Sequence, residues 1–294
     1  MSIETVKQFQ SKWYVPSRMV FCGLGIGHDD LVGHVQNLFG HLPADNLPVN
    51  KNASLTVPYY PPPPGEPAVY RGGYQFVEDH RKNEIGISLP GNFESFASVV
   101  LAFPAPGYYE KRQYYAAFIL GYLLGSGSSF SSGGPGKGMF SRVYTRMLRY
   151  GFIDSGTFIY NPYYETGLFG LNVSGIHDYL KNIQELSIVE MLGLQKISDE
   201  EFNRAKNQLR SLIFMNLENT GAAIDDFLRQ ICMYNTRADY DYHLSVIDNI
   251  TLEEVTSLAT EMLSAPPSIL VRSENDPSVP YNAFVKFIKG NLAK

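Results

Sequence analysis

Four consecutive prolines, Pro61–Pro64, lie in the segment PYYPPPPGEP at 58–67 and constrain the fold more than any other feature. A proline run favours the polyproline II conformation, and proline has no backbone N–H to donate to a central strand. No helix or strand is therefore expected to cross this segment. The sequence predicts a semi-rigid linker at 46–67 that separates residues 1–45 from residues 68–294. A proline-rich recognition ligand is the alternative interpretation.

The part before the linker contains a helix, a strand and a second helix. Residues 2–13 are predicted to be a short helix, and the apolar run RMVFCGLGIG at 18–27 is typical of a buried strand. Residues 28–42 place apolar side chains at helical spacing. Because both faces and both edges of a strand need partners, one strand cannot form a core. Residues 1–45 are therefore expected to pack against something else.

The part after the linker has a fuller pattern. Runs rich in β-branched and aromatic residues predict strands, helices follow them, and two capping boxes mark helix starts. Because the strands occur in runs and the helices are grouped, the sequence predicts an α+β fold with a mostly antiparallel sheet and helices packed on one face. The predicted strands are 67–79, 83–91, 96–105, 152–161, 166–175 and 266–274; the helices include 108–124 and 138–150; the capping boxes pair Ser198 with Glu201 and Thr251 with Glu254.

Composition excludes several classes of protein. The net charge of −5 argues against nucleic acid as the main partner. Two cysteines provide neither a disulfide framework nor a paired-cysteine metal site. The longest apolar run, YYAAFILGYLLG at 114–125, is about half the length needed to span a bilayer, so it is predicted to be a buried helix.

The glycine-rich segment at 125–138, GSGSSFSSGGPGKG, is the main functional candidate. A nucleotide-binding loop requires glycine where Ser131 stands and a hydroxyl residue where Gly138 stands, so phosphate binding is disfavoured. A passive connector between helices is usually shorter. Phe130 and Met139 place apolar side chains in and beside the segment. Contact with an extended or amphipathic peptide therefore remains open beside the connector interpretation.

The run GGPGKGMFSRVYTRML at 133–148 closely resembles the glycine-rich segment of the α subunit of the mitochondrial processing peptidase, and of the related core-2 type subunits of the cytochrome bc1 complex. The resemblance covers nearly the whole chain after residue 14. It extends to the segments YVPSRMVFCGLGIGHDDLV at 14–32, YRGGYQF at 70–76, ETGLFGL at 165–171, QLRSLIFMNLEN at 208–219 and MLSAPPSILVRSE at 262–274.

The resemblance implies a non-catalytic subunit of a pitrilysin-like metallopeptidase. In that family a β-type subunit carries zinc on an H-x-x-E-H helix. This sequence has six histidines and no such motif, so no cofactor or metal is expected in this chain and zinc is expected in the β-type partner. The glycine-rich segment is then expected to contact mitochondrial presequences. The residues implied are Gly133, Gly134, Pro135, Gly136, Lys137 and Gly138, with Phe130 and Met139 as apolar contacts.

Charged residues near this segment are interpreted separately. Arg142, Arg146 and Arg149 follow at helical spacing and are expected to form a solvated or interface face, since they would repel a basic presequence. Exposed acidic candidates for attracting the presequence are Glu78, Asp79 and Glu84.

Family members have two similar domains, so residues 1–45 are expected to be the C-terminal helix–strand–helix remnant of the first domain, with a companion polypeptide supplying the rest. The resemblance implies a place on the matrix side of the inner mitochondrial membrane, with other complex III subunits as partners. Two functions remain open: presequence recognition within the peptidase, and a purely structural core-2 role in the respiratory chain. An independent peptide-binding module outside mitochondria is a third.

Overall fold

The computed structural model describes residues 2–42, 69–79, 96–128, 139–234, 236–275 and 279–292. The chain divides into two compact units. One consists of Met1–Pro67 with Leu212–His243, and the other of Ala68–Ser211 with Leu244–Lys294. The predicted linker at 46–67 and the predicted strand at 83–91 lie outside the described residues.

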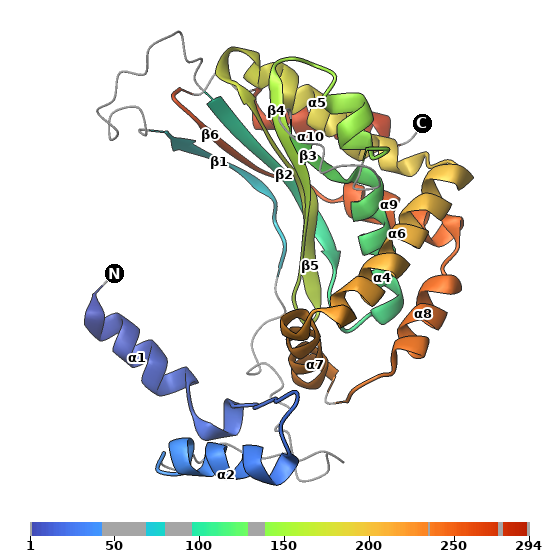
Figure 1. The fold of residues 1–294 in the computed structure, drawn as a ribbon. Helices are drawn as coiled ribbons and strands as arrows, with labels where there is room; N and C mark the ends of the chain where they lie inside the picture. Colours follow the sequence, from blue (N-terminus) through green and yellow to red (C-terminus); the bar gives the residue numbers. More distant parts are fainter. Residues whose placement is uncertain are drawn as a thin grey trace. The chain divides into compact units, whose positions relative to one another are not determined.

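The second unit is built on a mostly antiparallel sheet, which confirms the predicted fold class (Figure 1). Its strand order in the described residues is β1-β6-β2-β5-β4-β3, and the β1–β6 pair is parallel whereas the other pairs are antiparallel. The strands are β1 Gly73–Glu78, β2 Phe96–Pro106, β3 Ser126–Ser128, β4 Ile153–Pro162, β5 Thr166–Ile176 and β6 Ser268–Ser273.

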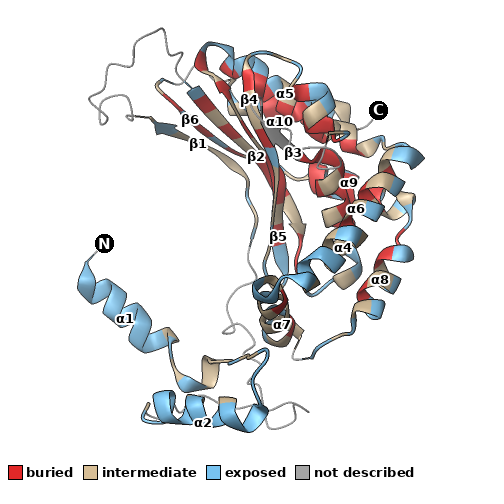
Figure 2. Ribbon diagram, viewed as in Figure 1, coloured by how far each residue is buried: buried red, intermediate tan, exposed pale blue. Residues whose placement is uncertain are grey.

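Helices of this unit cover one face of the sheet, where Figure 2 shows most of the buried residues. The central strand β2 explains why: Val99 and Leu101 are buried beneath the helices, whereas Ser98 and Val100 on the other face are only partly buried. Val99 lies opposite Val173 on β5 and Val271 on β6, so the apolar core continues across three strands. The helices are α4 Lys111–Leu124, α5 Leu180–Leu192, α9 Leu252–Ser264 and α10 Tyr281–Asn291, with the first part of α6 Asp199–Glu218.

The first unit contains α1 Ile3–Trp13, α2 His28–Phe39 and α7 Thr220–Tyr234, and α8 Tyr240–Asp248 begins in it. The two N-terminal helices confirm the predicted ones. The strand predicted at 18–27 is wrong: the chain forms a 3-10 turn at Pro16–Arg18 and then bends without pairing. A strand needs hydrogen-bonding neighbours, and the described residues of this unit provide none.

Apolar side chains of the first unit are poorly covered. No residue of α1 or α2 is buried. Phe21 packs its ring 4.8 Å from that of Phe39, yet both remain exposed, as do Ile3 and Phe9. The described part of residues 1–45 therefore presents apolar surface rather than a core. Among the described residues, no helix combines the length and apolar character required to cross a bilayer.

Candidate functional site

The glycine-rich segment leaves the fold at the end of α4. Gly125 follows the helix with a φ of +74°, and a Cβ placed on it would lie 2.1 Å from the Cβ of Ser141. Only glycine fits there, because the chain leaving α4 touches the chain that returns after the segment. Residues 126–128 then form β3, which pairs with β4 at the edge of the sheet. The fold therefore keeps the two ends of the glycine-rich segment close together.

The residues predicted to contact a peptide fall mostly outside the described part of the chain. Phe130, Gly133, Gly134, Pro135, Gly136, Lys137 and Gly138 all do so. Met139 is partly exposed in the turn that follows. Phe140, next to it, is 66% exposed. The Arg204 guanidinium lies 5.6 Å from the Phe140 ring centroid and donates to its carbonyl oxygen.

The helix predicted at 138–150 is wrong in its extent. The chain instead forms one wide helical turn at Val143–Met147, closed by a bond from the Leu148 N–H to the Val143 carbonyl. This i to i+5 pattern defines a π-helix. Such helices are rare in proteins, and those that occur often lie at functional sites. Val143 and Met147 are fully buried, so the turn is fixed by its apolar face.

The expectation of a solvated or interface arginine face is wrong for Arg142, which is buried within the second unit. Its side chain is 2% exposed and forms a double hydrogen bond with the Glu201 carboxylate, at 2.9 Å from Nε and 2.8 Å from Nη2. Its Nη2 also donates to the carbonyl oxygen of Lys196. A charged group is buried here because it is paired and hydrogen-bonded. Arg142 thereby attaches the chain that follows the glycine-rich segment to the start of α6.

Glu201 performs two tasks. Its carboxylate accepts from the Ser198 N–H while the Ser198 hydroxyl accepts from the Glu201 N–H, which confirms the predicted capping box. Hydrogen bonds from Arg142 lower the pKa of Glu201 to about 2. The sequence revealed the cap but not its link to Arg142, because the two residues are far apart in the chain and no local pattern connects them.

A second carboxylate completes this ion-pair cluster, which consists of Arg142, Arg146, Glu190 and Glu201. Arg146 Nη2 lies 3.1 Å from Glu201, and Arg146 Nη1 lies 3.7 Å from Glu190. Burial raises the pKa of Glu190 even though Arg146, Arg142 and Arg149 oppose the shift. Glu190 Oε2 accepts no hydrogen bond in the described structure, so desolvation outweighs its charge partners.

One of the three acidic candidates, Asp79, differs from expectation. The Asp79 side chain is 8% exposed rather than open to solvent, and its carboxylate lies 3.2 Å from Arg272 Nε. The charge of Asp79 is therefore already balanced by Arg272. Glu78 is exposed on β1, and Glu84 lies outside the described residues. Within the described ranges, no group of three histidine, cysteine or acidic side chains is arranged to hold a metal ion.

Comparison with known proteins identifies the family. A family model described as the peptidase M16 inactive domain matches residues 1–209. The chain belongs to this family. A protein from Arabidopsis thaliana, named probable mitochondrial-processing peptidase subunit alpha-2, chloroplastic/mitochondrial, is 32% identical over 267 residues, 90% of this chain and 48% of that protein. The α subunits from Caenorhabditis elegans and Homo sapiens are 29% and 28% identical over 91% and 90% of this chain.

The chain spans about half the length of these relatives. A solved structure of complex III from Candida albicans contains a chain that matches 90% of this M16 inactive-domain chain with a TM-score of 0.66. That chain is 17% identical in sequence and is covered over 56% of its length, so the likeness establishes the fold. The resemblance inferred from the glycine-rich run is thus confirmed at the level of family and fold.

Proposed function

We propose that this chain is a non-catalytic α-type subunit of the mitochondrial processing peptidase. The observation that carries the proposal is its match over about 90% of its length to relatives named as that α subunit. The matching family is described as inactive, and the sequence contains no H-x-x-E-H motif. In this proposal a β-type partner holds zinc and hydrolyses the peptide, and this chain adds no metal or cofactor.

The glycine-rich segment is proposed to contact mitochondrial presequences. Support comes from its frame: the two ends of the segment approach closely at Gly125 and Ser141, and Arg142 attaches the C-terminal end to α6. Met139, which is partly exposed, and Phe140, which is exposed, directly follow the glycine-rich segment and offer apolar contacts. Backbone groups of a glycine run can approach a guest closely without reading its side chains. The proposed contacts are Gly133, Gly134, Pro135, Gly136, Lys137 and Gly138, together with Phe130 and Met139.

A place in respiratory complex III is part of the same proposal, with the chain peripheral on the matrix side of the inner membrane. The likeness to a complex III chain favours it, and it also favours the second candidate, a purely structural core-2 subunit without a processing role. The retained glycine-rich segment favours recognition, because a structural subunit has no evident use for it.

A companion polypeptide is proposed to complete the first domain. The apolar side chains of α1 and of the 18–42 segment are exposed, and the segment predicted to be a strand has no pairing neighbour among the described residues. A sheet supplied from outside residues 1–294 would cover these apolar side chains and provide the pairing neighbour. A stable monomer whose 18–42 amides resist hydrogen exchange without any partner would contradict this part of the proposal.

Deletion of residues 129–137 in the assembled complex tests the recognition role, because it keeps β3 and Met139. We expect presequence cleavage to fall while the complex still assembles on native gels. A matched control replaces Ser129, Ser131 and Ser132 with alanine, which keeps the length and backbone and should preserve cleavage. Unchanged cleavage after the deletion would contradict recognition, and loss of assembly would favour the structural alternative.

A further inference from the structure

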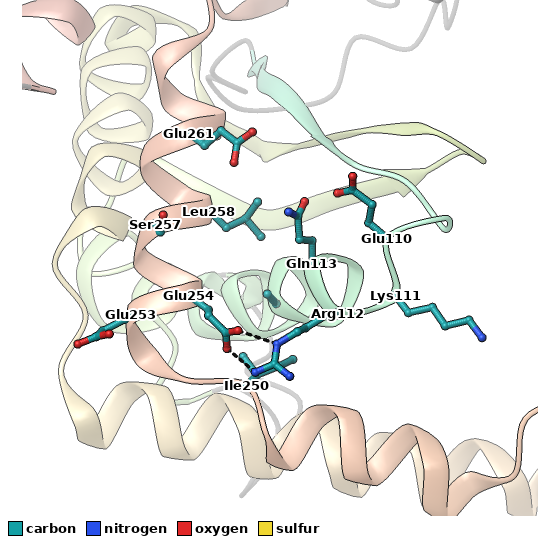
Figure 3. Close-up of a pocket in the computed structure, with 11 residues that line it drawn as sticks. Glu110, Lys111, Arg112, Gln113, Ile250, Glu253, Glu254, Ser257, Leu258 and Glu261 are labelled. Atoms are coloured by element: carbon teal, nitrogen blue, oxygen red, sulfur yellow. Dashed lines mark hydrogen bonds and ion pairs between the residues drawn. The ribbon is translucent and has the colours of Figure 1, made fainter.

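A groove of about 670 Å³ opens between the start of α4 and the face of α9, both in the second unit (Figure 3). Its floor is apolar: Ala116, Ile250 and Leu258 line it and are nearly fully buried in the fold. Figure 3 shows Leu258 and Gln113 projecting toward the same space from opposite sides. The groove therefore offers apolar contact to an inserted side chain.

One end of the groove is closed by a fixed ion pair. Arg112 Nε lies 2.6 Å from Glu254 Oε1, and its Nη2 lies 2.9 Å from Oε2. Arg112 also donates to the carbonyl oxygen of Asn249. Hydrogen bonds from Arg112 lower the pKa of Glu254 to about 2, so this pair stays ionised at neutral pH. The charge of Arg112 is thereby neutralised by a partner on the surface of the same unit.

The remaining charge around the groove is acidic. Glu110, Glu253 and Glu261 are exposed and form no ion pair with the described residues, against the single cation Lys111. In Figure 3 Glu110, which directly precedes α4, and Glu261 of α9 extend toward the groove from opposite sides, whereas Glu253 and Lys111 point away from it. The part of the rim that faces a guest is therefore negative.

The helix dipole favours a negative charge at the positions of Glu110 and Glu253 but not at the position of Glu261. Glu253 lies in the first turn of α9, and Glu110 directly precedes α4, where the helix dipole favours negative charge. Glu261 lies in the last turn of α9, where the dipole disfavours it. Its charge has no stabilising role visible in the fold, and it faces the groove.

We propose that this groove is a docking site for a neighbouring subunit, and that it receives a short peptide segment carrying a lysine or arginine beside an apolar side chain. The cation would lie between Glu110 and Glu261, and the apolar group would rest on Leu258 and Ala116. This inference uses the proposed function in one respect, that the chain works inside an assembly.

The position of the groove separates it from the proposed presequence contact. The groove lies at the N-terminal end of α4, whereas the glycine-rich segment begins at its C-terminal end. A helix of this length spans about 21 Å at about 1.5 Å per residue. The floor is preformed by two packed helices, which suits a permanent partner of fixed sequence.

Photocrosslinking in the intact native assembly tests the proposal. A benzoylphenylalanine at Ser257, which is exposed and lines the groove, should crosslink to one segment of one neighbouring subunit. Mass spectrometry should show a basic and an apolar residue in that segment. Because each carboxylate would form an exposed ion pair with the cation of the docked segment, E261Q should lower the crosslink yield about two- to five-fold and the E110Q/E261Q pair about ten-fold.

Glu253→Gln is the matched control, since it removes an exposed carboxylate of the same helix that points away from the groove, and its yield should not change. No crosslink, a crosslink only to presequence peptide, or a yield unaffected by E110Q/E261Q would overturn the inference. Should the crosslink form while the 129–137 deletion leaves cleavage intact, the recognition role fails and the docking groove stands.

Discussion

The buried Arg142–Glu201 pair and the exposed Arg112–Glu254 pair allow one comparison that isolates burial. Both glutamates complete a capping box at the start of a helix, both hold an arginine through two hydrogen bonds, and both have a pKa lowered to about 2. Arg142 is 2% exposed, whereas Arg112 is 49% exposed. The two pairs therefore differ mainly in desolvation, and Glu201 has Arg146 as a second ion-pair partner.

Replacing each glutamate by glutamine removes the negative charge and exchanges one carboxylate oxygen for an NH2 donor, so one side-chain oxygen is left to accept hydrogen bonds. E201Q removes the hydrogen-bonded counter-charge of a buried guanidinium, which costs about 3 kcal/mol, the lower end of the usual range because the Gln oxygen and the Lys196 carbonyl still accept hydrogen bonds and Glu190 stays nearby. E254Q leaves Arg112 in solvent and costs less than about 1 kcal/mol. For a unit of this size the melting temperature should fall by about 6–12 °C for E201Q and by less than about 4 °C for E254Q.

Differential scanning calorimetry of the full chain at neutral pH measures both shifts. Because the pKa of Glu201 is depressed when folded, its contribution is fully present above about pH 4.5 and is lost as the pH falls toward about 2. The gap between wild type and E201Q should therefore close in acid. Equal shifts for E201Q and E254Q at pH 7 would refute the reasoning, because proton affinity rather than burial would then set the cost.

Two further substitutions probe the same region. Gly125→Ala should destabilise the chain by about 2 kcal/mol or more, because its φ is +74° and the added methyl would meet Ser141; Gly151→Ala, with open space around it, should change the melting temperature little. Since burial raises the pKa of Glu190, Glu190→Gln should become progressively more favourable to stability, relative to wild type, as the pH rises from 4 to 7. A constant offset across that pH series would contradict the buried-carboxylate explanation.

Most described strands and helices of the second unit were predictable because their patterns are local, whereas β3 and the helical turn at Val143–Met147 were not. Strand β2 alternates buried and partly exposed side chains, and both capping boxes lie within four residues. Strand pairings between distant segments were not predictable. Nothing in residues 73–78 indicates that they pair in parallel with residues 268–273. The apolar run at 18–27 looked like a strand because composition reports burial, not whether a pairing partner exists.

The candidate site shows the same limit. The glycine-rich run and its apolar neighbours were visible in the sequence, but the fixed frame around it was not. Arg142 seemed solvated because arginines at helical spacing usually are, yet the chain forms a π-turn that directs it toward Glu201. Three-dimensional proximity decided the role of this residue, and no spacing rule could replace it.

Cleavage of a fluorescent presequence peptide, measured with the purified chain before and after a β-type partner is added, tests the central claim most directly. The account predicts no cleavage by the chain alone, and cleavage once the partner and its zinc are present. Hydrolysis by this chain unaided, or a native particle that contains no metallopeptidase-like relative, would contradict it.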